Sequence, residues 1–304
     1  MSRSGRFGTR AVAHDNLFAM RIGIVILPDG RWSETRERWV RAEALGFDHA
    51  WTYDHLTWRE LQNKPWFGSI PTLAAAAVVT SRMRLGTLVT SPNFRHPVTL
   101  GKELMSLDDI SGGRMTIGIG AGGDGFDATA LGTQAWTPRE RADRLQEFVA
   151  LLDTVLCEER SNYQGEFYSA VEARALPGCV QRPRPPFAIA GSGPRGMKLA
   201  VEHAAIWIGI DADDHRGPPG ESLEKMIAIC EREGRDPASI GRLALTGFTE
   251  QPTASVEAFR DVVGRYDEMG FTDLAIHWPR IREPFAADLK VLEDIADDVA
   301  RLNA

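Results

Sequence analysis

Short apolar runs alternate with longer amphipathic segments along most of the chain, and this alternation constrains the fold most strongly. Apolar runs of about four to eight residues between turn signals are typical of buried strands, and the longer segments fit helical periodicity. We expect strands at residues 21–27, 49–53, 83–89, 115–119, 187–190, 206–210, 243–248 and 272–278. Eight parallel strand–helix units close naturally into a ring. The sequence therefore predicts an α/β protein with a (β/α)8 TIM barrel, and a doubly wound open sheet is the weaker alternative.

The alternation is interrupted between the fourth and fifth expected strands. Residues 163–168 suggest a small hairpin there, and the proline-rich stretch 182–186 indicates a stiff connector. We therefore expect a small insertion around the strand 4 to strand 5 connection. The first nineteen residues are polar and arginine-rich, without an apolar signal-peptide core. We expect residues 1–19 to be a disordered N-terminal extension and residues 20–304 to form one barrel domain.

Charge and cysteine content narrow the classes of partner. The formal net charge of -7 disfavours nucleic acid and membrane surfaces, because their phosphates attract basic faces. No run approaches the roughly twenty apolar residues that span a bilayer. Cys157, Cys179 and Cys230 lie far apart, which fits a reducing compartment better than a disulfide framework. We therefore expect a cytoplasmic protein that binds neither nucleic acid nor membranes.

Asp54 and His55 follow the second expected strand, and Trp58 lies one turn further on. Barrel enzymes hold their chemistry at the C-terminal ends of the strands. Imidazole titrates near neutral pH, and a neighbouring carboxylate can orient it or raise its pKa. The Asp54–His55 pair is therefore the candidate for proton transfer. The alternative is a histidine that only hydrogen-bonds its own loop.

A glycine-rich turn follows the fifth expected strand and opens a helix. The candidate anion-binding residues in it are Gly191, Ser192, Gly193, Arg195 and Gly196. Glycines let backbone N–H groups approach a phosphate, and Pro194 suits the first turn of a helix whose N-terminus adds positive potential. Arg195 can add a charge-assisted hydrogen bond. We expect a phosphate cradle here, with an ordinary turn as the alternative.

Two further patterns are rejected as a dinucleotide site and a metal site. Residues 118–123 spell G-x-G-x-x-G, but no helix begins until about Pro138, so the dinucleotide fingerprint is incomplete. The loop that contains Ala121 is instead expected to bring backbone close to a flat ligand. The acidic residues and the histidine after the sixth expected strand lack the spacing of a ligand set, so we expect a solvated loop and no metal. They are Asp211, Asp213, Asp214 and His215.

Together these motifs resemble the luciferase-like monooxygenases, particularly the branch that uses the deazaflavin coenzyme F420. The resemblance extends from Met20 to about Trp278. It is carried by Asp54–His55, residues 85–90 with 95–97, Leu107–Asp108 with residues 111–114, and residues 189–194. The order and spacing of these motifs make the resemblance specific.

The resemblance implies a barrel that binds its cofactor at the strand C-termini, and a homodimer. It implies a non-prolyl cis peptide at Leu88–Val89 that forms a bulge against the middle of the cofactor ring. Asp54 and Ser91 would lie by the ring and its ribityl-like chain, and the loop 191–196 would hold the phosphate.

The resemblance also implies a chemistry. His55 matches a position that transfers protons in some sugar-phosphate dehydrogenases of the family, and Trp58 lies near a tryptophan of that site. Those enzymes have a glutamate where this chain has Gly123; Asp124 and Asp127 lie nearby without aligning with it. This difference argues against glucose-6-phosphate as the substrate.

We expect an oxidoreductase that transfers a hydride between coenzyme F420 and a small organic substrate. Two alternatives stay open at this point. One is an FMN-dependent monooxygenase, and the other is a flavin- or deazaflavin-binding protein without turnover.

Overall fold

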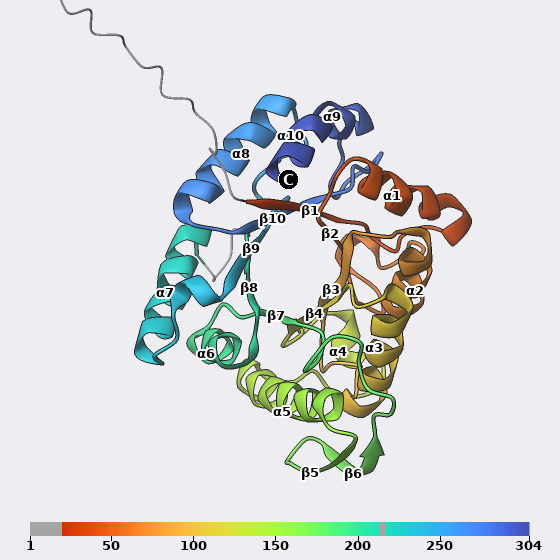
Figure 1. Ribbon diagram of the computed structural model, residues 1–304, viewed down its shortest axis with the longest axis vertical. Coiled ribbons are helices and arrows are strands. Elements are labelled where there is room, and N and C mark those ends of the chain that lie inside the picture. Colours follow the sequence, from red (N-terminus) through yellow and green to blue (C-terminus); the bar gives the residue numbers. More distant parts are fainter. Residues whose placement is uncertain (1–19, 213–216, 304) are drawn as a thin grey trace, which may run out of the picture.

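Eight parallel strands form a closed barrel in the computed structural model, which describes residues 20–212 and 217–303 (Figure 1). The order around the barrel is β1-β10-β9-β8-β7-β4-β3-β2. Their bounds are β1 Arg21–Val25, β2 His49–Thr52, β3 Arg84–Thr90, β4 Met115–Gly120, β7 Phe187–Ala190, β8 Ile206–Ile210, β9 Gly241–Leu245 and β10 Asp273–His277. The predicted (β/α)8 barrel is confirmed, and the open sheet is excluded.

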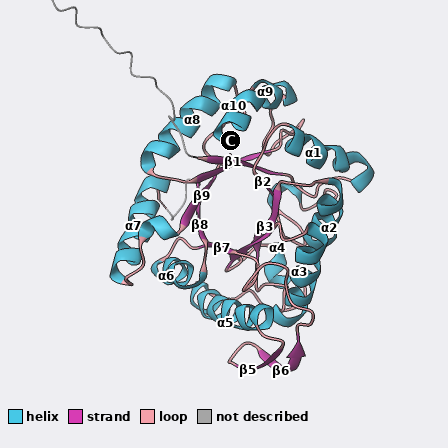
Figure 2. Ribbon diagram, viewed as in Figure 1, coloured by secondary structure: helices cyan, strands magenta, loops and turns pink. Residues whose placement is uncertain are grey.

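Helices surround the barrel and cover its outer face (Figure 2). They are α1 Trp32–Ala44, α2 Ser69–Val79, α3 Pro97–Ser111, α5 Pro138–Cys157, α6 Pro194–His203, α7 Pro219–Arg232, α8 Val256–Met269, α9 Leu289–Asp294 and α10 Ala296–Leu302. Short helical pieces lie in the loops: η1 Arg59–Leu61, α4 Phe126–Thr129 and η2 Pro237–Ser239. Strands covered on both faces read as continuous apolar runs, which is why the sequence revealed them. Every residue of β2, β4 and β10 is buried.

The expected insertion is an antiparallel hairpin between α5 and β7. Its strands are β5 Arg160–Gln164 and β6 Ser169–Arg174, and they lie outside the barrel beyond α5 (Figure 1). The side chain of Glu147 on α5 accepts hydrogen bonds from the backbone N–H groups of residues 166–168. The hairpin is therefore fastened to the outer helix layer.

Two groups of apolar side chains form the core. The larger group fills the space between strands and helices and includes Trp39 and Trp207. The smaller group fills the inside of the barrel and includes Trp51 and Leu88. Trp39, Trp51 and Trp207 are at most 2% exposed and belong to this core.

The pairing of β3 with β4 is irregular near the mouth of the barrel. The Leu88–Val89 peptide bond is cis, as expected, and the register shifts between Thr87 and Thr90. A Cβ atom at Gly118 would lie 1.9 Å from the Thr87 carbonyl oxygen, so only glycine fits beside this kink. The glycines of β4 thus allow the end of β3 to bulge.

The barrel closes through ion pairs and hydrogen bonds at its N-terminal end. Arg21 on β1 donates to both carboxylate oxygens of Asp273 on β10, at 2.8 and 2.9 Å. Asn303 binds the backbone N–H and C=O of Ile22 and the C=O of Gly46. Arg21 thus joins the first and last strands of the barrel, and Asn303 ties the C-terminal segment to β1 and to the turn after α1.

Cys157, Cys179 and Cys230 are free thiols, and the first of them is exposed. Within the described ranges, none of the helices is long and apolar enough to cross a bilayer.

Candidate functional site

A cavity of about 1360 Å³ opens at the C-terminal ends of the strands. Loops after β2, β3, β4 and β7 line it, together with strand β8 and the N-terminal parts of α5 and α6. Of the residues predicted for the site, those that line the cavity are His55, Trp58, Val89, Ala121, Gly191, Ser192, Gly193, Arg195 and Gly196. Asp54, Leu88 and Ser91 are buried beside it and are not among the described lining residues.

His55 contacts a carboxylate across the cavity rim. Its Nδ1 is hydrogen-bonded to Asp127 Oδ2. The other oxygen, Oδ1, accepts the backbone N–H of Leu56 at 2.8 Å and lies 3.4 Å from that of Thr57. An ionised carboxylate only accepts hydrogen bonds, so Nδ1 is the donor of this contact and Nε2 is the ring nitrogen left for a substrate. Asp127 is 6% exposed, and α4 positions it.

Asp54 does not orient His55, which corrects the sequence-based expectation. It is 1% exposed, and its carboxylate accepts hydrogen bonds from Arg95 at 2.7 and 3.1 Å and from Ser69 at 2.6 Å. Burial alone would lower the pKa of Arg95, but the hydrogen bonds and charge of Asp54 outweigh burial and raise it. Asp54 therefore ties the loops after β2 and β3 together beneath the cavity.

Aromatic rings form the wall near His55. Tyr53 lies edge-on to His55 and packs on Trp58, with ring centroids 6.2 and 5.2 Å apart. Trp58 is 6% exposed and stacks on Trp66 and Phe285. The Trp66 indole donates to the His55 carbonyl oxygen, so the rings also hold the His55 backbone. This wall keeps water away from one side of the imidazole.

A buried histidine supports this wall from inside the barrel. His277 Nε2 lies 2.7 Å from the Tyr53 hydroxyl, and its ring stacks on Phe285 with centroids 3.5 Å apart. Burial lowers the pKa of His277 to about 3 and raises that of Tyr53. Tyr53 therefore donates to a neutral His277 at neutral pH, and this pair is structural.

Val89 and the backbone of Gly120 and Ala121 line the cavity between β3 and β4, and we call this surface the ledge. A Cβ at Gly120 would lie 2.6 Å from Val89 Cγ2, so the absence of a side chain at Gly120 makes room for Val89. The chain then turns at Gly122, whose φ is +74°, and Asn93 Nδ2 donates to the Gly123 carbonyl. Ala121 lies in this turn and lines the cavity. Val89 and the glycine backbone together leave space for a planar ligand.

The glycine turn after β7 has the geometry of an anion cradle. A Cβ at Gly191 would lie 2.4 Å from the Gly196 carbonyl carbon, whereas Gly193 has open space around it. α6 begins at Pro194, and the N–H groups of its first turn lack intrahelical acceptors. The Trp207 indole donates to the Gly191 carbonyl at 2.9 Å and fixes the turn from below. Arg195 pairs with Asp143 and donates to Gln146 on α5.

These features fit a planar cofactor that carries a phosphate. The ledge at Val89 accommodates a flat ring, the close approach of Gly191 to Gly196 leaves backbone N–H groups available, and Arg195 supplies a nearby positive charge. A buried hydroxyl, Thr90 Oγ1, has no hydrogen-bond partner among the described residues and lies directly after the cis peptide.

Asp211, the first acidic residue after β8, differs from the expectation of a solvated loop. Asp211 is 1% exposed and accepts backbone hydrogen bonds from Gly247, Phe248 and Glu250. Burial raises the pKa of its carboxyl to about 6, although these hydrogen bonds oppose the shift. It organises the loop after β9. Asp213, Asp214 and His215 lie outside the described residues.

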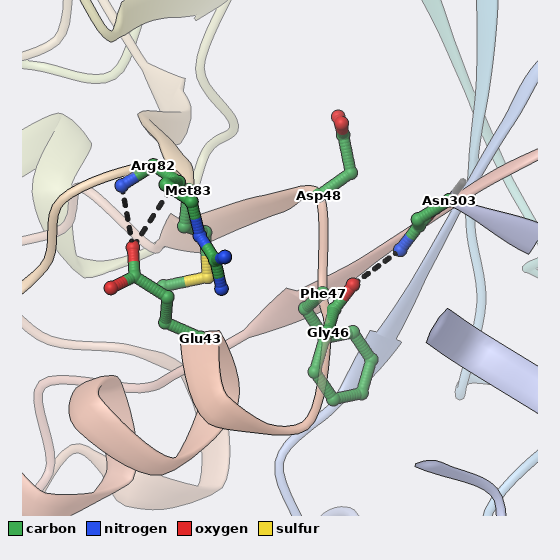
Figure 3. A pocket seen from close by; sticks show the side chains of 7 residues that line it. All are labelled: Glu43, Gly46, Phe47, Asp48, Arg82, Met83 and Asn303. Atoms are coloured by element: carbon green, nitrogen blue, oxygen red, sulfur yellow. Dashed lines mark hydrogen bonds between the residues drawn. The ribbon is translucent and has the colours of Figure 1, made fainter. Parts of the chain in front are cut away.

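A second, smaller hollow of about 190 Å³ lies at the opposite end of the barrel (Figure 3). Glu43 and Asn303 form hydrogen bonds on either side of it. The Glu43 carboxylate accepts the backbone N–H groups of Ser81, Arg82 and Met83. We do not expect the reaction at this end, because in barrel enzymes the N-terminal ends of the strands serve stability.

Among the cavity residues that sequence reasoning did not assign to the site, Asp127 and Arg59 matter most. Asp127 was noted only for its proximity to Gly123, although a carboxylate at the start of a helical turn was a usable signal. Arg59 lines the cavity and was not considered. Its position one residue after Trp58 was the available signal.

Comparison with known proteins identifies the family of the chain. Residues 20–287 match the family of luciferase-like monooxygenases. The F420-dependent hydroxymycolic acid dehydrogenase of Mycobacterium tuberculosis is 29% identical over 238 residues, which cover 75% of this chain and 63% of the relative. An F420-dependent glucose-6-phosphate dehydrogenase of Beutenbergia cavernae is 35% identical over 166 residues, which cover 53% of this chain and 47% of the relative. The matches thus span about half to three fifths of these curated relatives.

Solved structures share the fold. An F420-dependent secondary alcohol dehydrogenase in complex with an F420-acetone adduct superposes with a TM-score of 0.79 at 17% identity, covering 94% of this chain and 99% of the other. The coenzyme F420-dependent tetrahydromethanopterin reductase of Methanopyrus kandleri superposes with a TM-score of 0.70 at 20% identity, covering 92% and 98%. The family match extends over most of the chain, and the barrel, the cis peptide and the glycine cradle accompany it. The chain belongs to the luciferase-like monooxygenase family.

Proposed function

We propose that this protein is an oxidoreductase that transfers a hydride between coenzyme F420 and a small organic substrate. The observation that carries the proposal is the His55–Asp127 pair at the rim of a cavity that also contains a flat ledge and an anion cradle. The names of the relatives, which include F420-dependent dehydrogenases, support the choice of cofactor. When bound, F420 supplies two-electron hydride chemistry, and the protein supplies position and electrostatics.

Different residues of the chain would bind the ring and the phosphate of the cofactor. Val89 and the backbone of Gly120–Ala121 would support the ring, and the turn 191–196 with Arg195 would hold the phosphate. Arg195 is paired with Asp143, so the guanidinium remains beside the cradle with or without a ligand. Trp58 and its neighbours would exclude water from the reacting side.

His55 would move the proton. With its Nδ1 proton held by Asp127, the free lone pair on Nε2 accepts the hydroxyl proton of a substrate as its hydride leaves. Asp127 stabilises the imidazolium that forms and fixes the orientation of the ring. Asp127 thereby acts through His55 and is a positioning residue.

The cofactor assignment is tested by titration. Purified protein is equilibrated with F420 and, separately, with FMN, and binding is followed by absorbance. We expect F420 to bind at least tenfold more tightly than FMN. Equal or reversed affinities would overturn the F420 assignment and favour a flavin enzyme.

The proton-transfer role is tested with Asp127→Asn. The amide keeps an oxygen that can accept the Leu56 N–H, so the loop stays folded, but it no longer stabilises a charged His55. We expect kcat to fall on the order of 10- to 100-fold, with the F420 affinity unchanged and the pH profile displaced. Asp127→Glu should recover part of the rate. An unaltered pH profile with normal kcat would contradict the role.

We further propose that the protein is a homodimer of the cytoplasm. The scattered free cysteines and the family resemblance support this proposal. Light scattering coupled to size-exclusion chromatography measures the assembly directly, and a monomer at micromolar concentration would contradict it.

A further inference from the structure

Arg59 stands between two aromatic rings at the mouth of the cavity. Its guanidinium carbon lies 5.3 Å from the ring centroid of Trp58 and 5.3 Å from that of Phe248. Both rings are held in place: Trp58 by stacking on Trp66, and Phe248 by edge-on packing against Phe285. A guanidinium between two rings loses little further conformational freedom when it binds a ligand.

The positive charge of Arg59 is not neutralised within the described part of the chain. No carboxylate there forms an ion pair or hydrogen bond with its guanidinium, and the two rings are its recorded contacts. The other described arginines of the cavity are engaged: Arg195 binds Asp143, Arg139 lies 4.0 Å from the same carboxylate, and Arg141 donates to the Trp136 carbonyl. Arg59 therefore has free hydrogen-bond donors. Of the cavity arginines it is also the nearest in sequence to His55, the proposed proton-transfer residue.

The backbone also holds Arg59 in an unusual conformation. Its φ is +36°, in the left-handed region that side chains larger than glycine rarely adopt. The residue begins the short helix η1, which Leu61 anchors by its burial. Such local strain often marks residues that a binding site positions.

Arg59 and the phosphate cradle belong to well-separated parts of the barrel mouth. Arg59 follows β2, whereas the cradle follows β7, and β3 and β4 lie between these strands in the barrel. His55 is on the same side as Arg59, connected to it through Tyr53 and Trp58. A cofactor with its phosphate in the cradle and its ring over Val89 would leave Arg59 facing the substrate.

We propose that Arg59 binds a carboxylate of the substrate, so that the enzyme acts on small hydroxy acids or the corresponding oxo acids. This inference rests on the proposed function. In the oxidative direction the substrate carbon gives its hydride to F420, the hydroxyl gives its proton to His55 Nε2, and a C=O bond forms. The planar guanidinium fork matches a carboxylate with two parallel hydrogen bonds.

The test uses small anions and neutral isosteres as probes. Benzoate, phenyl phosphate and benzamide are titrated into the protein by calorimetry, with and without saturating F420. We expect benzoate to bind about tenfold more tightly than benzamide, and Arg59→Gln to abolish that difference. Arg59→Lys should retain part of it. Arg282→Gln is the matched control, because Arg282 is an exposed arginine at the same end of the barrel that does not line the cavity.

The outcomes separate this inference from the cofactor assignment. Equal affinities for benzoate and benzamide in the wild type would overturn the role of Arg59, whatever F420 does. A loss of F420 affinity in Arg59→Gln with benzoate binding intact would also overturn it and assign Arg59 to the cofactor. A tighter fit for phenyl phosphate than for benzoate would replace the carboxylate by a phosphate. Failure of F420 to bind at all, with the benzoate preference present, would overturn only the proposed reaction.

Discussion

Replacing Glu43 with glutamine tests whether the N-terminal end of the barrel depends on a single carboxylate. Oε1 of Glu43 accepts the backbone N–H groups of Ser81, Arg82 and Met83 at 2.9, 2.7 and 2.9 Å. Burial alone would raise the pKa of Glu43, but these hydrogen bonds outweigh it and lower the pKa from 4.5 to about 2. The carboxylate therefore fastens α1 to the turn that leads into β3 (Figure 3).

The size and pH range of the effect follow from that pKa. A shift of this size corresponds to about 3 kcal/mol if nothing weakens it. Because the side chain is partly in contact with solvent, we expect Glu43→Gln to lower the free energy of unfolding by about 1–2 kcal/mol at pH 7. The folded-state pKa is the lower one, so the contribution is complete above pH 4.5 and is lost as the pH falls towards 2.

Urea unfolding at pH 7, 5 and 3 measures this contribution as the difference between wild type and Glu43→Gln. Using the difference removes the acid sensitivity that both proteins share. Glu224→Gln is the control, because Glu224 is exposed on α7 and should change stability by less than about 0.5 kcal/mol. A Glu43→Gln difference that stays constant from pH 7 to pH 3 would refute the reasoning.

Further substitutions test the phosphate cradle and the contacts of Asn303 at the N-terminal end of the barrel. In Gly191→Ala the new methyl group would lie 2.4 Å from the Gly196 backbone, so we expect F420 affinity to fall at least tenfold and stability by about 1–3 kcal/mol, measured by titration and urea unfolding. Gly264→Ala, in the open middle of α8, should instead stabilise the protein by about 0.5–1 kcal/mol. Asn303→Ala removes three hydrogen bonds and should lower the free energy of unfolding by about 2–3 kcal/mol, with Asn303→Asp intermediate. An Asn303→Ala protein as stable as wild type would contradict the stabilising role of these hydrogen bonds.

The strands were predictable because most of their residues are buried and apolar on both faces. Residues 206–210 were predicted as a strand and form β8 with the same bounds. The cradle was also visible locally, since Gly191 to Gly196 are adjacent in the chain and Pro194 marks the helix start. Signals of this kind depend on neighbours in sequence.

The partner of His55 was not predictable in the same way. Asp127 lies 72 residues away, and the nearer Asp54 offered a simpler explanation. Asp54 is drawn away by Arg95, itself 41 residues distant, through an ion pair that the barrel creates by bringing the loops after β2 and β3 together. The tertiary fold determines which of these partners each side chain contacts, and the dipeptide Asp54–His55 alone does not indicate it.

The joining of β1 to β10 has a consequence for how the chain folds during synthesis. Arg21 must find Asp273 across 252 residues, and the bonds between Asn303 and Ile22 come from still later in the chain. β2, β3 and β4 can pair with one another early, but the edge of β1 that faces β10 stays exposed until nearly the whole polypeptide has left the ribosome. Until then an apolar strand edge is available to other chains. The late pairing of β1 with β10 therefore makes the nascent chain more dependent on protection from aggregation than the finished barrel is.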